Sequence, residues 1–123
     1  MTPGGFKPFE HVWALADAFE FHQRIGKSKV AARTHELSRQ LKEGLAAMPH
    51  VKLYTPMAED LSAGIVCFDI YGMSPPEVVE RLKSRQIAAT TTPYVPTYAR
   101  FTPSIRNSPA EIETVLREIR ALA

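Results

Sequence analysis

Within this 123-residue chain, Arg100 has the side chain best suited to bind a small acid. A guanidinium group is planar and can donate two parallel hydrogen bonds to one carboxylate. Its neighbours Tyr98, Phe101 and Pro103 are aromatic or apolar, and apolar surroundings strengthen an ion pair because they lower the local dielectric constant. The spacing alone favours a solvated arginine on an edge strand, since charged strand residues are usually exposed.

Three consecutive threonines and a single cysteine are the next candidates. Thr90, Thr91 and Thr92 precede a proline-flanked loop. They either form a wall of a substrate pocket or follow the preference of β-branched residues for strands, and we favour the second explanation for at least two of them. Cys67 lies in the most apolar run and is expected to be an inert thiol in the core. Because no second cysteine exists, no internal disulfide can form, and a cytoplasmic location is the simpler expectation.

The histidines do not predict a metal site. His11 and His22 share a helix face, but they are too far apart in sequence to bind one ion, since helical metal ligands are usually three or four residues apart. No cysteine or histidine flanks them as a partner. We expect no bound metal and expect both side chains to lie at a surface or between domains.

The composition is that of an ordinary globular domain. Hydrophobic residues make up 45% of the chain and charged residues 23%, which suits one domain with a substantial core. The formal net charge is +2, and the basic residues alternate with acidic ones, which argues against nucleic-acid binding. No stretch approaches the roughly 18 apolar residues of a membrane span. We therefore expect neither nucleic acid nor a membrane as a partner.

Two helical patterns come first in the chain. After the Pro- and Gly-rich residues 1–9, apolar residues recur at three- and four-residue steps from Glu10 to Ile25. A clearer amphipathic stripe runs from about Ser28 to Met48. Gly26 between them suits a helix end or a kink, so the region forms either one long kinked helix or two helices.

Short strands and helices alternate in the rest of the chain. Ser74 and Ser108 each precede a proline and, three residues on, a glutamate, which is typical of a helix N-terminal cap. Helices are therefore predicted over 75–85 and 109–122. Strands are predicted at 51–54, 63–70, 87–92 and 98–103.

These elements predict an α/β fold of the α+β two-layer sandwich type. We expect a small mixed or antiparallel sheet with helices on one face, preceded by a long or kinked helix. The short connection between the first two strands predicts that this pair is antiparallel.

Two motifs, with this order of elements, resemble the small C-terminal domain of class V aminotransferases. That family of pyridoxal-phosphate enzymes includes cysteine desulfurases and isopenicillin N epimerase-like enzymes. The first motif is Thr2–Phe6 followed by Phe9–Leu15. It is similar to the end of the family's large domain, where a Gly-Thr turn supports the phosphate of the cofactor. The resemblance therefore implies a cofactor contact for Thr2.

The second motif is Ala99–Pro103 followed by Asn107–Ile112. It resembles the family's terminal signature, in which an arginine on a strand precedes a turn, an Asn-Thr-type cap and a Glu-Glu-Ile sequence. In the family, that arginine pairs with the α-carboxylate of the substrate. The resemblance therefore implies that Arg100 binds the carboxylate of an amino acid.

The resemblance also implies that the catalytic centre lies outside this chain. Residues 1–26 correspond to the tail of the large domain and 27–123 to the small C-terminal domain, whereas the family's cofactor lysine, pyridine-facing aspartate and stacking group lie upstream. We expect pyridoxal phosphate in the intact enzyme, none bound to this chain alone, and no catalytic residue here. Four of the lysines are expected to be solvated, and Lys7 lies in a Pro-rich loop. None of the six has the family's lysine context: Lys7, Lys27, Lys29, Lys42, Lys52 and Lys83.

Two functions follow from these observations. In the first, the chain is an inactive fragment or split subunit that needs a large domain, and a homodimer is expected. Trp13, Phe19 and Phe21 then lie on an exposed apolar surface of the first helix. In the second, the chain is a stand-alone α/β module that binds a small molecule or a protein, with a closed polar surface.

Overall fold

The computed structural model describes residues 8–123 of the chain. It contains four helices and four strands in the described part. In chain order they are α1 (Phe9–Ile25), α2 (Lys27–Ala46), β1 (Val51–Leu53), β2 (Val66–Ile70), α3 (Pro75–Ser84), β3 (Thr90–Thr91), β4 (Ala99–Phe101) and α4 (Pro109–Arg120).

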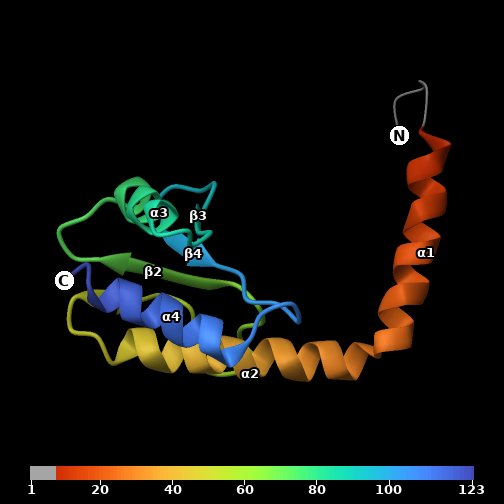
Figure 1. The fold of residues 1–123 in the computed structure, drawn as a ribbon, viewed down its shortest axis with the longest axis horizontal. Coiled ribbons are helices and arrows are strands. Elements are labelled where there is room, and N and C mark those ends of the chain that lie inside the picture. Colours follow the sequence, from red (N-terminus) through yellow and green to blue (C-terminus); the bar gives the residue numbers. More distant parts are fainter. Residues whose placement is uncertain (1–7) are drawn as a thin grey trace.

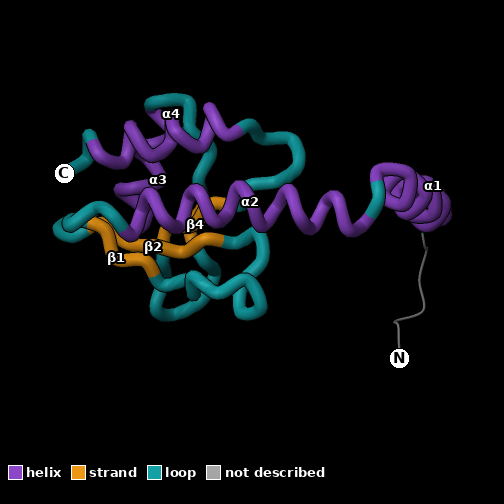
Figure 2. Tube along the Cα trace, turned by 90° about the horizontal axis from the view of Figure 1, so that it is seen from below, coloured by secondary structure: helices purple, strands orange, loops and turns teal. Residues whose placement is uncertain are grey.

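The four strands form one antiparallel sheet in the order β1-β2-β4-β3. Helices α2 and α4 lie side by side along the sheet, and α3 packs near the β3 edge (Figures 1 and 2). The predicted α+β sandwich, its antiparallel first strand pair and its helices on one face are confirmed.

Alternate side chains along the strands build the core, because successive strand residues point to opposite faces of a sheet. The Phe68 and Phe101 rings stack at a centroid distance of 5.3 Å in the middle of the buried face. The strands and helices α2, α3 and α4 contribute to a single cluster. Its main members are Leu37, Leu41, Leu45, Val66, Phe68, Ile70, Val78, Leu82, Ala99, Phe101, Ile112, Leu116 and Ile119.

Helix α1 stands apart from this domain. Gly26 separates it from α2 with a φ of 98°, a backbone conformation that favours glycine, and α1 turns away from the sheet (Figure 1). None of its residues is buried, and Trp13 is 71% exposed. The expected exposed apolar surface, which includes Phe19 and Phe21, is confirmed.

Helices α2 and α4 approach closely where α2 has a glycine. A Cβ atom placed on Gly44 would overlap the side chain of Leu116 on α4. Glycine at this position therefore sets how near the two helices can lie, and their contact completes the helical layer.

The strands are shorter than the apolar patterns predicted. The run at 63–70 pairs only from Val66, and the run at 87–92 pairs only at Thr90–Thr91. A strand extends only where a neighbouring backbone hydrogen-bonds to it, and this information is absent from a local sequence pattern. The helices lie within two residues of their predicted bounds.

Lys42 departs from the solvated positions expected for most of the lysines. Its side chain is 2% exposed within the core side of α2. The ammonium group donates hydrogen bonds to the carbonyl oxygens of Pro56 and Met57, both at 3.0 Å, and to Oγ of Ser62 at 2.8 Å. Buried ammonium groups need such partners, and these contacts attach the 56–62 loop to α2.

The predicted N-terminal caps of α3 and α4 are confirmed. At α4, the backbone N–H of Glu111 donates to Oγ of Ser108 at 3.2 Å, and the Glu111 carboxylate accepts from the backbone N–H of Ser108 at 2.6 Å. Ser74 and Glu77 form the corresponding box at α3. These reciprocal bonds satisfy N–H groups that a helix start leaves unpaired.

We expect Ser108→Ala to lower the free energy of unfolding by about 1 kcal/mol, because one N–H of α4 loses its acceptor. The hydrogen bonds from Ser108 also hold the pKa of Glu111 below its ordinary value. A carboxyl group of this kind stabilises the fold above its unfolded pKa, and the contribution is lost as the pH falls through the folded pKa.

The deficit of Ser108→Ala should therefore be largest near neutral pH and shrink below about pH 4. Urea unfolding at several pH values measures it. Ser28→Ala, at an exposed position of α2, is the control and should change stability little at any pH. The variant keeps the backbone N–H bond to Glu111 and removes only the bonds of the hydroxyl. A deficit that is the same at all pH values would contradict the contribution of the Ser108 hydroxyl to the low pKa of Glu111.

Candidate functional site

The face of the sheet that the helices leave open carries charged side chains beside aromatic and apolar ones. Ala99 and Phe101 on β4 point into the core, so Arg100 between them points to the open face. The strand register places Arg100 opposite Cys67 of β2 on one side and Thr90 of β3 on the other.

The guanidinium group of Arg100 is oriented by one side chain. Its Nε donates a hydrogen bond to Oγ1 of Thr90 at 2.8 Å. Within residues 8–123, neither Nη atom has a hydrogen-bond or ion-pair partner. Two parallel donors at the end of the fork are therefore free for an incoming oxyanion.

The three threonines have different surroundings. Thr90 contacts Arg100, whereas Oγ1 of Thr92 accepts from the backbone N–H of Tyr98 at 2.9 Å. Thr91 completes β3. The backbone N–H of Thr92 also donates to the carbonyl oxygen of Tyr98 at 2.9 Å. These bonds connect the two ends of the 93–97 loop.

A shallow cavity of about 500 Å³ lies beside Arg100 on the open face, and we call it the Arg100 pocket. Its aromatic wall includes Tyr54 and Tyr98, whose ring centroids are 4.1 Å apart. Its volume falls in the range of small-molecule sites. The remaining large side chains around it are Ile65, Tyr94, Val95 and Pro96.

Cys67 lies on the floor of the Arg100 pocket, so its predicted place in the core is wrong. The continuous apolar run 63–70 concealed the alternation of β2, which sends Phe68 inward and Cys67 outward. Partial burial raises the pKa of the Cys67 thiol, although Thr55 and Arg100 act in the opposite direction. A thiol with a raised pKa stays protonated at neutral pH and is a poor nucleophile.

The next row of the open face carries opposite charges. Lys52 on β1 pairs with Asp69 on β2 in the register, and the Lys52 ammonium lies 4.9 Å from the centroid of the Tyr54 ring. Partial burial and the Asp69 carboxylate raise the pKa of Tyr54, so this phenol stays neutral. Tyr54 and Asp69 were not among the predicted site residues, although the period of two along each strand places them on the face of Arg100.

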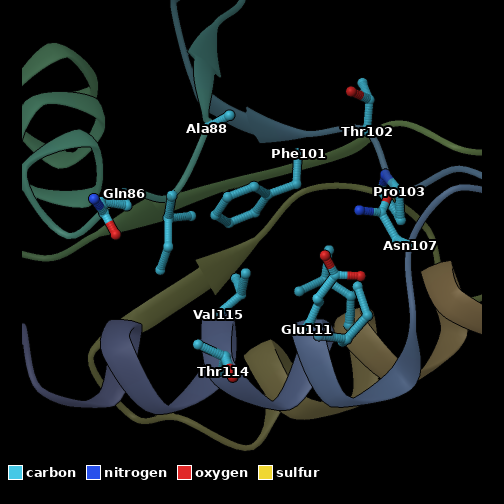
Figure 3. Close-up of a pocket in the computed structure, with 12 residues that line it drawn as sticks. Gln86, Ala88, Phe101, Thr102, Pro103, Asn107, Glu111, Thr114 and Val115 are labelled. Carbon is cyan, nitrogen blue, oxygen red and sulfur yellow. The ribbon is translucent and has the colours of Figure 1, made fainter.

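A second cavity, of about 460 Å³, lies on the helix side of the sheet. In Figure 3, Phe101 points into it from β4, and Val115 and Glu111 face it from α4. No basic side chain lines it within the described residues. The Glu111 carboxylate is engaged by Ser108, so this cavity has no charged group free for a ligand.

The described residues do not form a site for pyridoxal phosphate. The cofactor needs a lysine near a phosphate-binding loop, and the lysines of 8–123 other than Lys42 are exposed. Lys42 is buried, but three oxygen acceptors already surround its ammonium group. Thr2, the predicted cofactor contact, and Lys7 lie outside the described residues.

Residues 8–123 contain no group of three or more His, Cys, Asp or Glu side chains placed to hold a metal ion. None of the helices in that range is both long and apolar enough to cross a membrane.

Solved structures share this fold. The chain matches the apo cysteine desulfurase from Thermococcus onnurineus NA1 with a TM-score of 0.89 and 25% identity, over 98% of this chain and 32% of that one. It matches the S-sulfonic acid form of the cysteine desulfurase CsdA from Escherichia coli with a TM-score of 0.84 and 16% identity, over 98% and 32%. A C-DES mutant with glycine covalently linked to its PLP cofactor gives a TM-score of 0.74 and 24% identity, over 84% and 26%.

These matches and the family profile support different statements about the chain. The two structures with lower identity show the fold alone, and the chain spans about a third of the length of the desulfurases it matches. The comparison with curated proteins gives no match. The sequence profile described as Aminotransferase class-V matches residues 2–100, a range that includes Arg100. The chain therefore belongs to the class V aminotransferase family.

Proposed function

We propose that this chain is the substrate-binding C-terminal part of a pyridoxal-phosphate enzyme that acts on an amino acid. The observation that supports this proposal is the guanidinium group of Arg100, which Thr90 orients while both Nη atoms are left free within residues 8–123. In the proposed enzyme, these two donors bind the α-carboxylate of the substrate. The lysine-bearing domain supplies the cofactor and its chemistry.

The surface of α1 supports a need for further protein. The helix has no buried residue, and its exposed apolar side chains include Trp13, Phe19 and Phe21. Several large exposed apolar side chains on one helix favour an interface with other protein. We propose that α1 packs against the large domain, and that the intact enzyme is a cytoplasmic homodimer. A stand-alone module would instead be expected to have a closed polar surface.

We do not propose that this chain takes part in sulfur transfer. The only cysteine, Cys67, sits on a central strand with a raised thiol pKa. A cysteine that accepts sulfur needs an accessible thiolate. The loop between β3 and β4, Thr92–Tyr98, contains no cysteine. The similarity to cysteine desulfurases therefore supports the fold but not their reaction.

Arg100→Gln should weaken the binding of propionate to this chain by about 10- to 100-fold, because hydrogen bonds to a charged group contribute about 1.5–3 kcal/mol. Propionate provides the carboxylate and little else, so it tests this contact directly. Amide NMR titration measures the dissociation constant, and the perturbed signals should centre on Thr90, Cys67 and Arg100.

Arg106→Gln is the matched control, because Arg106 is exposed and lies outside the Arg100 pocket. It should bind propionate as the unchanged chain does. Addition of pyridoxal phosphate to the chain should give no visible absorbance band of a specific Schiff base. Equal propionate binding by Arg100→Gln and the unchanged chain would disprove the carboxylate role of Arg100.

A further inference from the structure

Apolar side chains surround the free guanidinium of Arg100. Tyr54 and Tyr98 pack against each other on one side of the Arg100 pocket, and Ile65, Tyr94 and Val95 border it elsewhere. Ile65, Tyr94 and Val95 are exposed in this chain. Exposed apolar groups beside an unpaired cation favour a ligand that has an acidic end and an apolar body.

The residues of this chain that line the pocket offer no partner to a second acidic group on the ligand. Arg100 is the only charged residue that lines the Arg100 pocket in the described part of the chain. In the next row of the open face, Lys52 lies opposite Asp69 in the strand register, so this cation already has an acidic neighbour. A second carboxylate on the ligand would lose its hydrating water and gain no partner in the pocket, which is costly.

The orientation of Arg100 fixes which end of the ligand it meets. Because Nε donates to Thr90, a carboxylate is bound end-on by Nη1 and Nη2. The rest of the ligand then extends away from the guanidinium toward the walls. The cavity of about 500 Å³ is large enough for a side chain of the size of a benzyl group.

We propose that the Arg100 pocket selects monocarboxylic acids with an apolar side chain, aromatic ones above all. This inference rests on the proposed function, since it assigns the substrate class of the same carboxylate site. The substrate of the intact enzyme is then an aromatic or large aliphatic amino acid or the corresponding 2-oxo acid. Tyr94 and Ile65 determine this specificity through contact with the ligand side chain.

Three acids test the proposal on this chain. Propionate carries a carboxylate alone, 3-phenylpropionate adds an aromatic ring, and succinate adds a second carboxylate. NMR titration should give a dissociation constant for 3-phenylpropionate about tenfold lower than for propionate, because part of an aromatic ring leaves water. Succinate should bind no more tightly than propionate. Tyr94→Ala and Ile65→Ala, both at exposed positions, should reduce the ratio of 3-phenylpropionate affinity to propionate affinity toward one.

The outcomes separate the two proposals. If all three acids bind equally and Arg100→Gln weakens each of them, the specificity is disproved and the carboxylate site stands. If Arg100→Gln leaves the dissociation constant of every acid unchanged, both proposals fail. Tighter binding of succinate than of 3-phenylpropionate would also overturn the inference, because it would require a second cation in the pocket.

Discussion

Lys42→Ala is expected to lower the free energy of unfolding by about 2–4 kcal/mol. The alkyl stem of Lys42 fills the core side of α2, and its ammonium group binds oxygen atoms of Pro56, Met57 and Ser62. Alanine removes both the packing and the donors. Such a loss is a large part of the 5–15 kcal/mol that stabilises a typical domain.

Chemical unfolding followed by circular dichroism measures this effect. Lys42→Met retains an unbranched apolar side chain and removes the ammonium, so the difference between the two variants separates packing from hydrogen bonding. Lys83→Ala is the matched control, because the Lys83 side chain is 75% exposed, and it should change stability by no more than about 0.5 kcal/mol. Equal unfolding midpoints for Lys42→Ala and Lys83→Ala would contradict the structural role of Lys42.

Lys42→Ala should also affect the loop that borders the Arg100 pocket. The loop that Lys42 holds leads from Pro56, which lines the pocket, toward Ile65 on its wall. Without the ammonium group, the loop loses its attachment to α2, and we expect faster amide hydrogen exchange over residues 56–62. We therefore expect this buried cation to support a site on the opposite face of the sheet.

Phe68→Ala is expected to destabilise the domain by about 3–5 kcal/mol. Phe68 is 0% exposed and lies at the centre of the sheet, with its ring stacked on Phe101 at 5.3 Å. Removal of the ring leaves a cavity that the paired strands β2 and β4 cannot close. Thermal or urea unfolding of the purified variant measures the loss.

Phe19→Ala provides the contrast for Phe68→Ala. Phe19 is equally large but 61% exposed on α1, so its removal should change the stability of the isolated chain by about 0.5 kcal/mol or less. The unfolding midpoints of the Phe19→Ala and Phe68→Ala variants should be independent of protein concentration. A loss for Phe19→Ala comparable to that for Phe68→Ala would mean that α1 is packed in solution, contrary to the structure.

Local sequence patterns predicted the helices well, because the signals for a helix lie within the helix itself. The apolar stripe of α2 and the capping residues Ser74 and Ser108 require no distant partner. The same holds for the α1 surface: an amphipathic pattern with aromatic residues identified Trp13 and Phe19 whether or not they were covered. The motif around Arg100 likewise identified the family from adjacent residues.

The strand ends and the surroundings of single side chains depended on the tertiary structure. β2 begins at Val66 because β4 pairs with it from that residue onward, and no pattern in 63–70 encodes the position of β4. Cys67 was misplaced for a related reason, since a continuous apolar run does not reveal which alternate residues face the helices. Lys42 and its three oxygen partners come from separate parts of the chain.

The sequence by itself therefore determined the elements, their order, the family and the identity of the candidate carboxylate-binding group. The tertiary structure decided what surrounds that group: Thr90 on its Nε, the aromatic pair Tyr54 and Tyr98, and the free Nη atoms. The physical reason is the range of the interactions. Helix periodicity and caps act over three or four residues, whereas a binding pocket forms only when strands distant in sequence pair in one register.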